Sequence, residues 1–351
     1  HYVKGDQEIY HKGSVKGSMG FAPFMPRENK GLPMLNFLLL DIDVDIDANR
    51  LKFIKFFVPG LSGFDVDGRG RVSGRLRFDK GVVQEGTDLS VEAGDLAVAV
   101  LSHHIRGSGE VQLAMGPETG GTLDLGFLFR DLQVVHEENS RPMLTGEELL
   151  LKIGGDGSLV PDPDKTNESR EIVLEIEGLT VPDLALFQRY LPQKWPFKLY
   201  GGDGTLRGHA RLTPSLLSVD LSLDSDEADM GVKQYRFLTN LDAALKLDNP
   251  DLMSSSTRVG GSFIRLSDAY LVREGQKDTR SWSASLELDD GEFTLLAAGD
   301  KTEDSDIKDL FRTMGNSETR QLLGNSSGKI GFRADVSSLA WIGAFLNDDY
   351  R

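Results

Sequence analysis

The chain has no cysteine, no long apolar run and an excess of acidic over basic residues. Without cysteine it has neither a disulfide framework nor a thiolate metal site. No segment reaches the roughly 18 consecutive apolar residues of a membrane-spanning helix, since the longest dense run is Leu35 to Leu40. The net charge of −16 argues against nucleic acid as a partner, because nucleic-acid binding needs a basic surface. The same charge opposes adsorption of the whole chain to an anionic membrane by charge alone.

The composition that remains is that of a folded protein. Hydrophobic residues make up 39% and charged residues 27% of the 351 positions, which excludes wholesale disorder and leaves room for about two domains. The 39 glycines indicate many tight turns. Because the chain starts at His1 without a methionine or a signal peptide, we expect it to be a fragment whose targeting segment lies elsewhere.

Period-two alternation is the dominant signal and predicts antiparallel strands with one apolar face. The segment 40–47 alternates strictly between aliphatic residues and aspartate. We expect the following residues of this and later strands to share the apolar face: Ile42, Val44, Ile46, Val72, Leu76, Phe78, Leu96, Val98, Val100, Leu123, Leu125, Phe127, Ile172, Leu174, Ile176, Leu206, Val219, Leu221, Leu223, Leu241, Leu245 and Leu247. Periodicity alone allows two arrangements, and it fits a closed sandwich better than an open, curved sheet whose trough holds an apolar ligand.

A helix–proline–glycine–strand passage occurs twice, about 133 residues apart. The first copy runs from Phe56 to Phe78, and the second from Arg189 to Leu212. Repetition on this scale predicts an array of similar units. We expect N-terminal strands and a loop at 1–47, a first unit at 48–180, a second at 181–337 and the start of a third at 338–351.

The predicted helices are few, short and amphipathic. Asp47 is expected to cap a helix over 48–58, and Thr180 one that carries Pro182 and an acid in its first turn. Two further helices are expected after Ser305 and over 338–347, the latter because it parallels 183–192.

No residue pattern predicts chemistry, and the chain is expected not to be an enzyme and to hold no cofactor or metal. The aspartates between 41 and 47 resemble the start of a calcium loop, but the glycine and glutamate of that loop are missing, so a solvated strand face is the better interpretation. The glycines around Gly68 and Gly202 precede a strand instead of opening a helix, which favours close backbone approach over phosphate binding. His103 and His104 are adjacent and should face opposite ways in a strand.

The two repeated passages resemble the AsmA-like, or TamB-like, proteins of Gram-negative bacteria. The resemblance rests on the strand openings Gly68 to Gly74 and Gly202 to Gly208, on the preceding helix that ends at Pro59 or Pro192, and on the alternation that follows. It implies an elongated, twisted antiparallel sheet with a hydrophobic groove (a β-taco), built from repeated units.

The same resemblance implies a periplasmic, non-enzymatic protein that conducts phospholipid between the inner and outer membranes and serves outer-membrane biogenesis. The partners it implies are phospholipid or another acyl-chain lipid, the inner membrane through an anchor outside this chain, and outer-membrane assembly proteins. Two alternatives remain. One is a closed β-sandwich scaffold or adhesin-like module without a lipid groove, and the weaker one is a carbohydrate-active β-solenoid enzyme, whose paired carboxylates are not identifiable.

Overall fold

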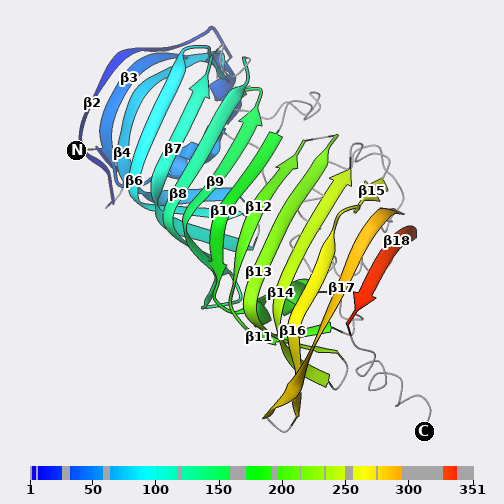
Figure 1. Ribbon diagram of the computed structural model, residues 1–351. Coiled ribbons are helices and arrows are strands. Elements are labelled where there is room, and N and C mark those ends of the chain that lie inside the picture. Colours follow the sequence, from blue (N-terminus) through cyan, green and yellow to red (C-terminus); the bar gives the residue numbers. More distant parts are fainter. Residues whose placement is uncertain are drawn as a thin grey trace. The chain divides into compact units, whose positions relative to one another are not determined.

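The structure, a computed structural model, is mainly β and its paired strands run antiparallel (Figure 1). It describes residues 2–4, 7–25, 32–57, 64–100, 102–116, 121–158, 171–191, 197–213, 215–232, 235–249, 256–273, 276–294 and 327–337. The prediction of a mainly β, antiparallel fold with few short helices is confirmed. The predicted helices after Ser305 and over 338–347, and the start of a third unit at 338–351, lie outside the described residues.

The described residues fall into two compact units, which divide within β10 between Ile176 and Glu177. Unit 1 holds the residues up to 176 together with 211–213, and unit 2 holds the others. The first strands are β1 (Tyr2–Lys4), β2 (Gln7–Phe21), β3 (Leu38–Ala48), β4 (Phe64–Asp79), β5 (Val82–Val83), β6 (Thr87–Val100), β7 (His103–Met115), β8 (Leu123–His136), β9 (Pro142–Gly155) and β10 (Glu171–Val181). The remaining strands are β11 (Phe197–Gly201), β12 (Gly204–Leu212), β13 (Leu217–Val232), β14 (Tyr235–Asn249), β15 (Ser256–Arg258), β16 (Phe263–Arg273), β17 (Gln276–Thr294) and β18 (Ser327–Val336).

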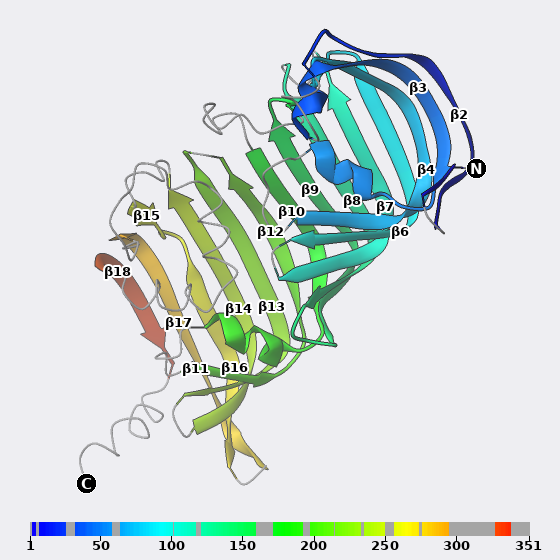
Figure 2. The ribbon, with the colours of Figure 1, turned by 180° about the vertical axis from the view of Figure 1, so that it is seen from behind.

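Unit 1 is one sheet in which β2, β3, β4, β6, β7, β8 and β9 pair in that order. The register places apolar residues of successive strands opposite one another, and directly paired residues share a face. One such row is Ile46, Val72, Val91, Val111, Phe127 and Leu151. The 3-10 helix η2 (Lys52–Phe57) lies against this apolar face and buries Ile54 and Phe57 (Figure 2).

Unit 2 is a second antiparallel arrangement, in which β11, β13, β14, β16, β17 and β18 pair in that order. The short β15 joins the ends of β14 and β17. The 3-10 helix η4 (Leu184–Tyr190) buries Leu184 and is capped by Asp183, whose side chain accepts a hydrogen bond from the Ala185 N–H at 2.9 Å. Among the described residues the remaining helix is η1 (Leu32–Phe37), also a 3-10 helix.

The repeated passage is a structural repeat. The Leu51 N–H donates to the Gly68 carbonyl at 3.2 Å, and the Leu184 N–H donates to the Gly202 carbonyl at 2.7 Å. Six residues after these glycines, Gly74 in β4 and Gly208 in β12 have φ values of 130° and 139°. A Cβ atom would lie 2.1 Å from the Asp88 carbonyl oxygen at Gly74 and 2.0 Å from that of Asp220 at Gly208, so close backbone approach requires glycine here.

A third example of the glycine strand was not predicted from the sequence. Gly13 and Gly17 in β2 have the same spacing as Gly70 and Gly74 in β4, and Phe21 and Phe78 each follow four residues later. Gly17 has a φ of 143°, and a Cβ atom there would lie 2.1 Å from the Asp41 carbonyl oxygen. The four-residue spacing of Gly13 and Gly17 could have predicted this strand, but the helix and proline that precede the other two copies are missing here.

Two predicted helix boundaries were wrong. The helix expected over 48–58 begins only at Lys52, because Ala48 still pairs with Gly70 as the last residue of β3. The helix expected to be capped by Thr180 begins after Asp183, because β10 continues to Val181. In both places the backbone hydrogen bonds of the sheet continue through residues that local capping signals assign to a helix.

Candidate functional site

The candidate site is the apolar side of the sheet in unit 2. Pairing places Leu221 opposite Leu245, and the row Leu223, Ala243, Ile264, Leu286 and Ala334 crosses five strands from β13 to β18. We call the set that these pairs bring to one side the unit 2 apolar face. It consists of Val219, Leu221, Leu223, Leu241, Ala243, Leu245, Leu247, Ile264, Leu266, Ala284, Leu286, Leu288, Phe332, Ala334 and Val336.

Much of the unit 2 apolar face is open to solvent. The exposed fractions are 45% for Leu245, 38% for Ile264, 38% for Leu286 and 65% for Phe332. Large aliphatic and aromatic side chains usually lose most of their exposure on folding, so a contiguous group that keeps it calls for an explanation. Past the bulge between Ser225 and Ala228 in β13, the sheet is covered again. Phe237 is 2% exposed there, and its ring packs edge-on against that of Trp282 with centroids 5.5 Å apart.

In unit 1 the corresponding side of the sheet is packed. Leu125 and Phe127 are fully buried, and the rings of Phe57 in η2 and Phe78 in β4 stack with centroids 6.0 Å apart. The gap that remains between η2 and the strands has a volume of about 10 Å³, too small for a hydrocarbon chain. The face is less covered at the β2 edge, where Met19 is 73% exposed.

The residues predicted to share the apolar face thus fall into two environments. Those that are buried are Val72, Phe78, Leu96, Val98, Leu123, Leu125, Phe127, Ile176 and Leu241. Those that are half-buried or exposed are Ile42, Val44, Ile46, Leu76, Val100, Ile172, Leu174, Leu206, Val219, Leu221, Leu223, Leu245 and Leu247. Leu286 and Phe332 lie in segments whose alternation also predicts strands, whereas Ile264 was missed. The alternation of Ile264 with Leu266 could have predicted that β16 contributes to this face.

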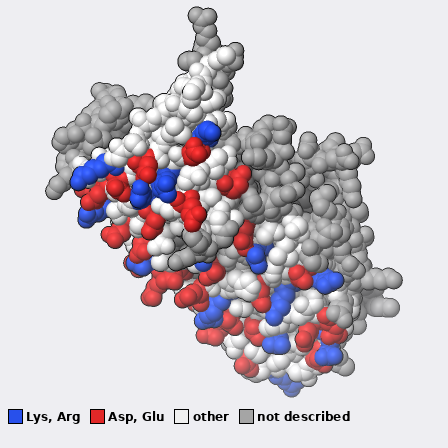
Figure 3. All heavy atoms as spheres, turned by 90° about the horizontal axis from the view of Figure 1, so that it is seen from above, with Lys and Arg blue, Asp and Glu red and all other residues white. Residues whose placement is uncertain are grey.

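The opposite side of the sheet carries ion pairs between neighbouring strands. Arg75 binds Asp41, and Arg71 binds Asp45, each with a shortest distance of 2.9 Å. The hydrogen bond from Arg75 lowers the pKa of Asp41, and that from Arg71 lowers the pKa of Asp45. Unit 2 repeats the arrangement with Arg265 and Asp242 at 3.2 Å. Acidic and basic residues accordingly alternate over the described surface in Figure 3.

These contacts agree with the prediction of a solvated strand face at residues 41–47. Exposed pairs of this kind contribute little to stability but fix strand register and oppose edge-to-edge association. Within the described part of the chain, no group of three or more His, Asp or Glu residues is arranged to hold a metal ion.

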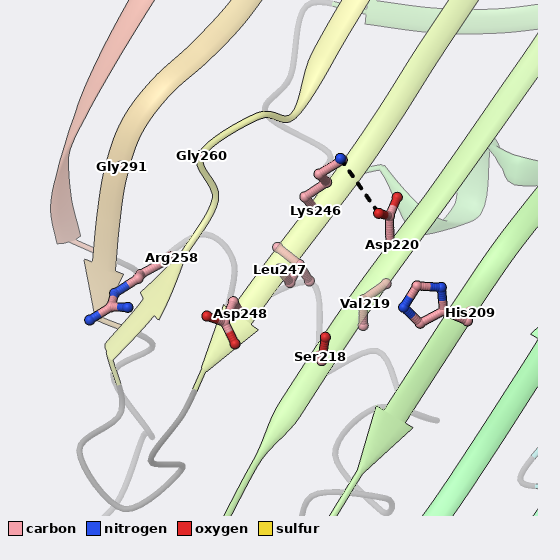
Figure 4. Close-up of a pocket in the computed structure, with 10 residues that line it drawn as sticks. All are labelled: His209, Ser218, Val219, Asp220, Lys246, Leu247, Asp248, Arg258, Gly260 and Gly291. Carbon is pink, nitrogen blue, oxygen red and sulfur yellow. Dashed lines mark ion pairs between the residues drawn. The ribbon is translucent and has the colours of Figure 1, made fainter.

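A pocket of about 630 Å³ lies within unit 2 (Figure 4). It is lined by His209, Ser218, Val219, Asp220, Lys246, Leu247, Asp248, Arg258, Gly260 and Gly291. The Lys246 ammonium and the Asp220 carboxylate are 3.5 Å apart, and both side chains are close to half exposed. The charged side chains that line the pocket are solvated and carry both signs.

The histidines form a contact that the sequence did not predict. His103 in β7 pairs with His136 in β8, and their rings meet edge to face with centroids 5.1 Å apart. The Nδ1 atom of His136 accepts a hydrogen bond from the Glu138 N–H at 3.1 Å. His104 pairs with Val135 on the opposite side of the sheet, as the strand period predicts.

Comparisons of the chain with protein-family models, with curated proteins and with solved structures give no match. Among the helices of the described residues, none has the length and apolar character needed to cross a bilayer.

Proposed function

We propose that the chain is a non-enzymatic lipid-binding protein of the AsmA-like type, which holds acyl chains of phospholipids against the unit 2 apolar face. The single observation that carries this proposal is the exposure of Leu245, Ile264, Leu286 and Phe332 on one side of one sheet. In the proposed role the protein works in the periplasm, anchored in the inner membrane by a segment outside this chain. There it conducts phospholipid toward the outer membrane.

The chemistry of the face suits hydrocarbon better than a polar ligand. Apart from Ser225, which pairs with Leu241, the residues that pair on this side of β13, β14, β16, β17 and β18 are aliphatic, aromatic or alanine. Each methylene of an acyl chain removed from water against such a face contributes up to about 0.8 kcal/mol. Because apolar contacts are non-directional, a chain gains affinity without a fixed position and can slide along the face.

The packed interior of unit 1 favours the second candidate function for that unit. A sheet whose apolar side is filled by η2, with Leu125 and Phe127 fully buried, is what a scaffold module without a lipid groove requires. In the combined proposal, unit 2 binds the acyl chains and unit 1 supports it.

Two neighbouring residues of β13 give the matched test. Leu221 belongs to the unit 2 apolar face, whereas Ser222, the next residue, points to the opposite side of the sheet. We expect native mass spectrometry and lipid extraction to find phospholipid with the wild type and with Ser222→Asp. Leu221→Asp should lose it while staying folded and soluble. Lipid-free wild-type protein from every preparation would favour the scaffold instead.

A further inference from the structure

A stretch in unit 2 has the opposite charge from the rest of the chain. Residues 184–202 contain three basic residues, Arg189, Lys194 and Lys198, and no acidic residue, in a protein whose net charge is −16. The described part of this stretch comprises η4, Leu191, β11 and Gly202, and η4 contacts β11. One such contact is the hydrogen bond from the Leu199 N–H to the Gln188 side-chain oxygen at 2.7 Å.

Three aromatic side chains of η4 and β11 are exposed. The exposed fractions are 42% for Tyr190, 38% for Phe197 and 43% for Tyr200. Large rings at the surface of a protein mark interaction sites more often than aliphatic residues do, because they bury much area for little conformational entropy. Together with Lys198 and Arg236 we call them the unit 2 aromatic–basic patch.

Register and ring contacts fix the members of the patch. Lys198 pairs with Gly231, and Gly231 pairs with Arg236, so the two basic residues share a side of the sheet. The Tyr200 ring lies beside Gly231, and the Arg236 guanidinium lies 5.1 Å from the ring centroid while it also binds Asp229. Phe197 precedes Lys198 in the strand and points to the other side. β11 pairs with β13 and contacts η4, so the exposed rings of Phe197 and Tyr200 lie on opposite faces of this strand.

The equivalent region of unit 1 lacks this basic character. Phe56 in η2 is 48% exposed, but Lys52 binds Asp67 and Lys55 binds Asp65, each at 3.6 Å. Asp65 and Asp67 lie three residues and one residue before Gly68. The residues at the same distances before Gly202, the equivalent glycine of unit 2, are Leu199 and Gly201. No ion pair within 4.0 Å joins Lys198 to a carboxylate of the described residues.

We propose that the unit 2 aromatic–basic patch docks onto the surface of a bilayer that contains anionic phospholipid. Tyrosine and phenylalanine rings insert at the headgroup boundary, and Lys198, which unlike Arg236 is bound to no carboxylate of the described residues, binds anionic headgroups. Rings on both faces of one short strand can enter a fluid interface together, whereas a flat rigid surface would meet only one of them. The repulsion from the net charge of −16 does not prevent this, because at physiological salt it is screened within about 8 Å.

This inference does not rest on acyl-chain binding by the unit 2 apolar face, and its test has a separate readout. Purified protein is sedimented with vesicles of phosphatidylcholine alone and with vesicles that also contain phosphatidylglycerol. The wild type should bind the anionic vesicles and bind pure phosphatidylcholine more weakly. Lys198→Glu should weaken binding at least about fivefold, the value of one basic side chain near an anionic surface.

Three further variants make the test decisive. Phe197→Ser and the combined Tyr190→Ser, Phe197→Ser and Tyr200→Ser variant should lose binding progressively, and Phe56→Ser, the matched ring of unit 1, should bind like the wild type. Thermal unfolding of each variant separates a binding defect from misfolding, and Lys198→Glu changes only an exposed side chain. Equal sedimentation with both vesicle types, no sedimentation of the wild type, or unchanged binding by folded Lys198→Glu and Phe197→Ser would each overturn the proposal.

Discussion

The two units contain the same helix and glycine strand but differ in what covers the apolar face of the sheet. In unit 1, Ile54 and Phe57 of η2 pack against the apolar face of the sheet, and Phe127 on that face is fully buried. In unit 2, η4 buries Leu184 alone, and Leu245 on the apolar face is 45% exposed. The shared motif therefore does not by itself close the apolar face, and the side chains that the helix presents contribute to the difference.

The sharpest way to break this comparison is to place a charge on each face. Leu125→Asp introduces a carboxylate at a fully buried position of unit 1, and Leu245→Asp places one at a position that is 45% exposed in unit 2. We expect the first to lower the free energy of unfolding by several kcal/mol and the second by less than about 1 kcal/mol. Chemical denaturation measures both, and equal losses would show that the two faces are equally closed.

Removing the ring that closes unit 1 should make it resemble unit 2. Phe57→Ala deletes a side chain that is 7% exposed and stacked on Phe78. The expected loss is about 3–5 kcal/mol in the free energy of unfolding, because the cavity can collapse only partly. Binding of an environment-sensitive hydrophobic dye should rise at the same time. The control is Phe56→Ala in the same helix, where the ring is 48% exposed and a small effect is expected.

The glycine strands should be equally sensitive in the two units. Alanine at Gly74 or Gly208 would bring Cβ within 2.1 Å or 2.0 Å of a carbonyl oxygen at a positive φ. Each substitution should cost about 1–3 kcal/mol in the free energy of unfolding. Gly126→Ala in β8 is the matched control, since a Cβ there meets nothing within 4 Å. A loss in one unit only would mean that the repeat is not structurally equivalent.

The smallest expected effect concerns the ion pairs of β3 and β4. Hydrogen bonds from arginine lower the pKa values of Asp41 and Asp45 in the folded state below their ordinary value of 3.8. Their contribution is therefore complete above that value and is lost as the pH falls through the lower, folded pKa. The free energy of unfolding is measured from neutral pH into this acidic range. It should depend slightly less on pH in the double variant Asp41→Asn, Asp45→Asn than in the wild type. A stronger dependence in the variant would contradict the assigned sign.

The sequence predicts the strands well because alternation of period two reports directly on a half-buried sheet. Residues 40–47 illustrate this, since their alternation matches β3. Helix boundaries were missed where sheet pairing extends to Ala48 and Val181. The difference between the two units was not predictable, because Leu125 and Leu245 occupy the same kind of alternating pattern. Their burial is decided by distant contacts, such as that of Phe57 with Phe78, and local sequence does not encode those.

Site-specific photocrosslinking on either side of β14 tests the central claim most directly. A photoreactive phenylalanine analogue is placed at Leu245, on the unit 2 apolar face, or at the adjacent Lys246, on the opposite side of the sheet. After irradiation with phospholipid present, mass spectrometry should find lipid adducts at position 245 and none at 246. Adducts at neither position, or equally at both, would contradict an open apolar face that accepts acyl chains.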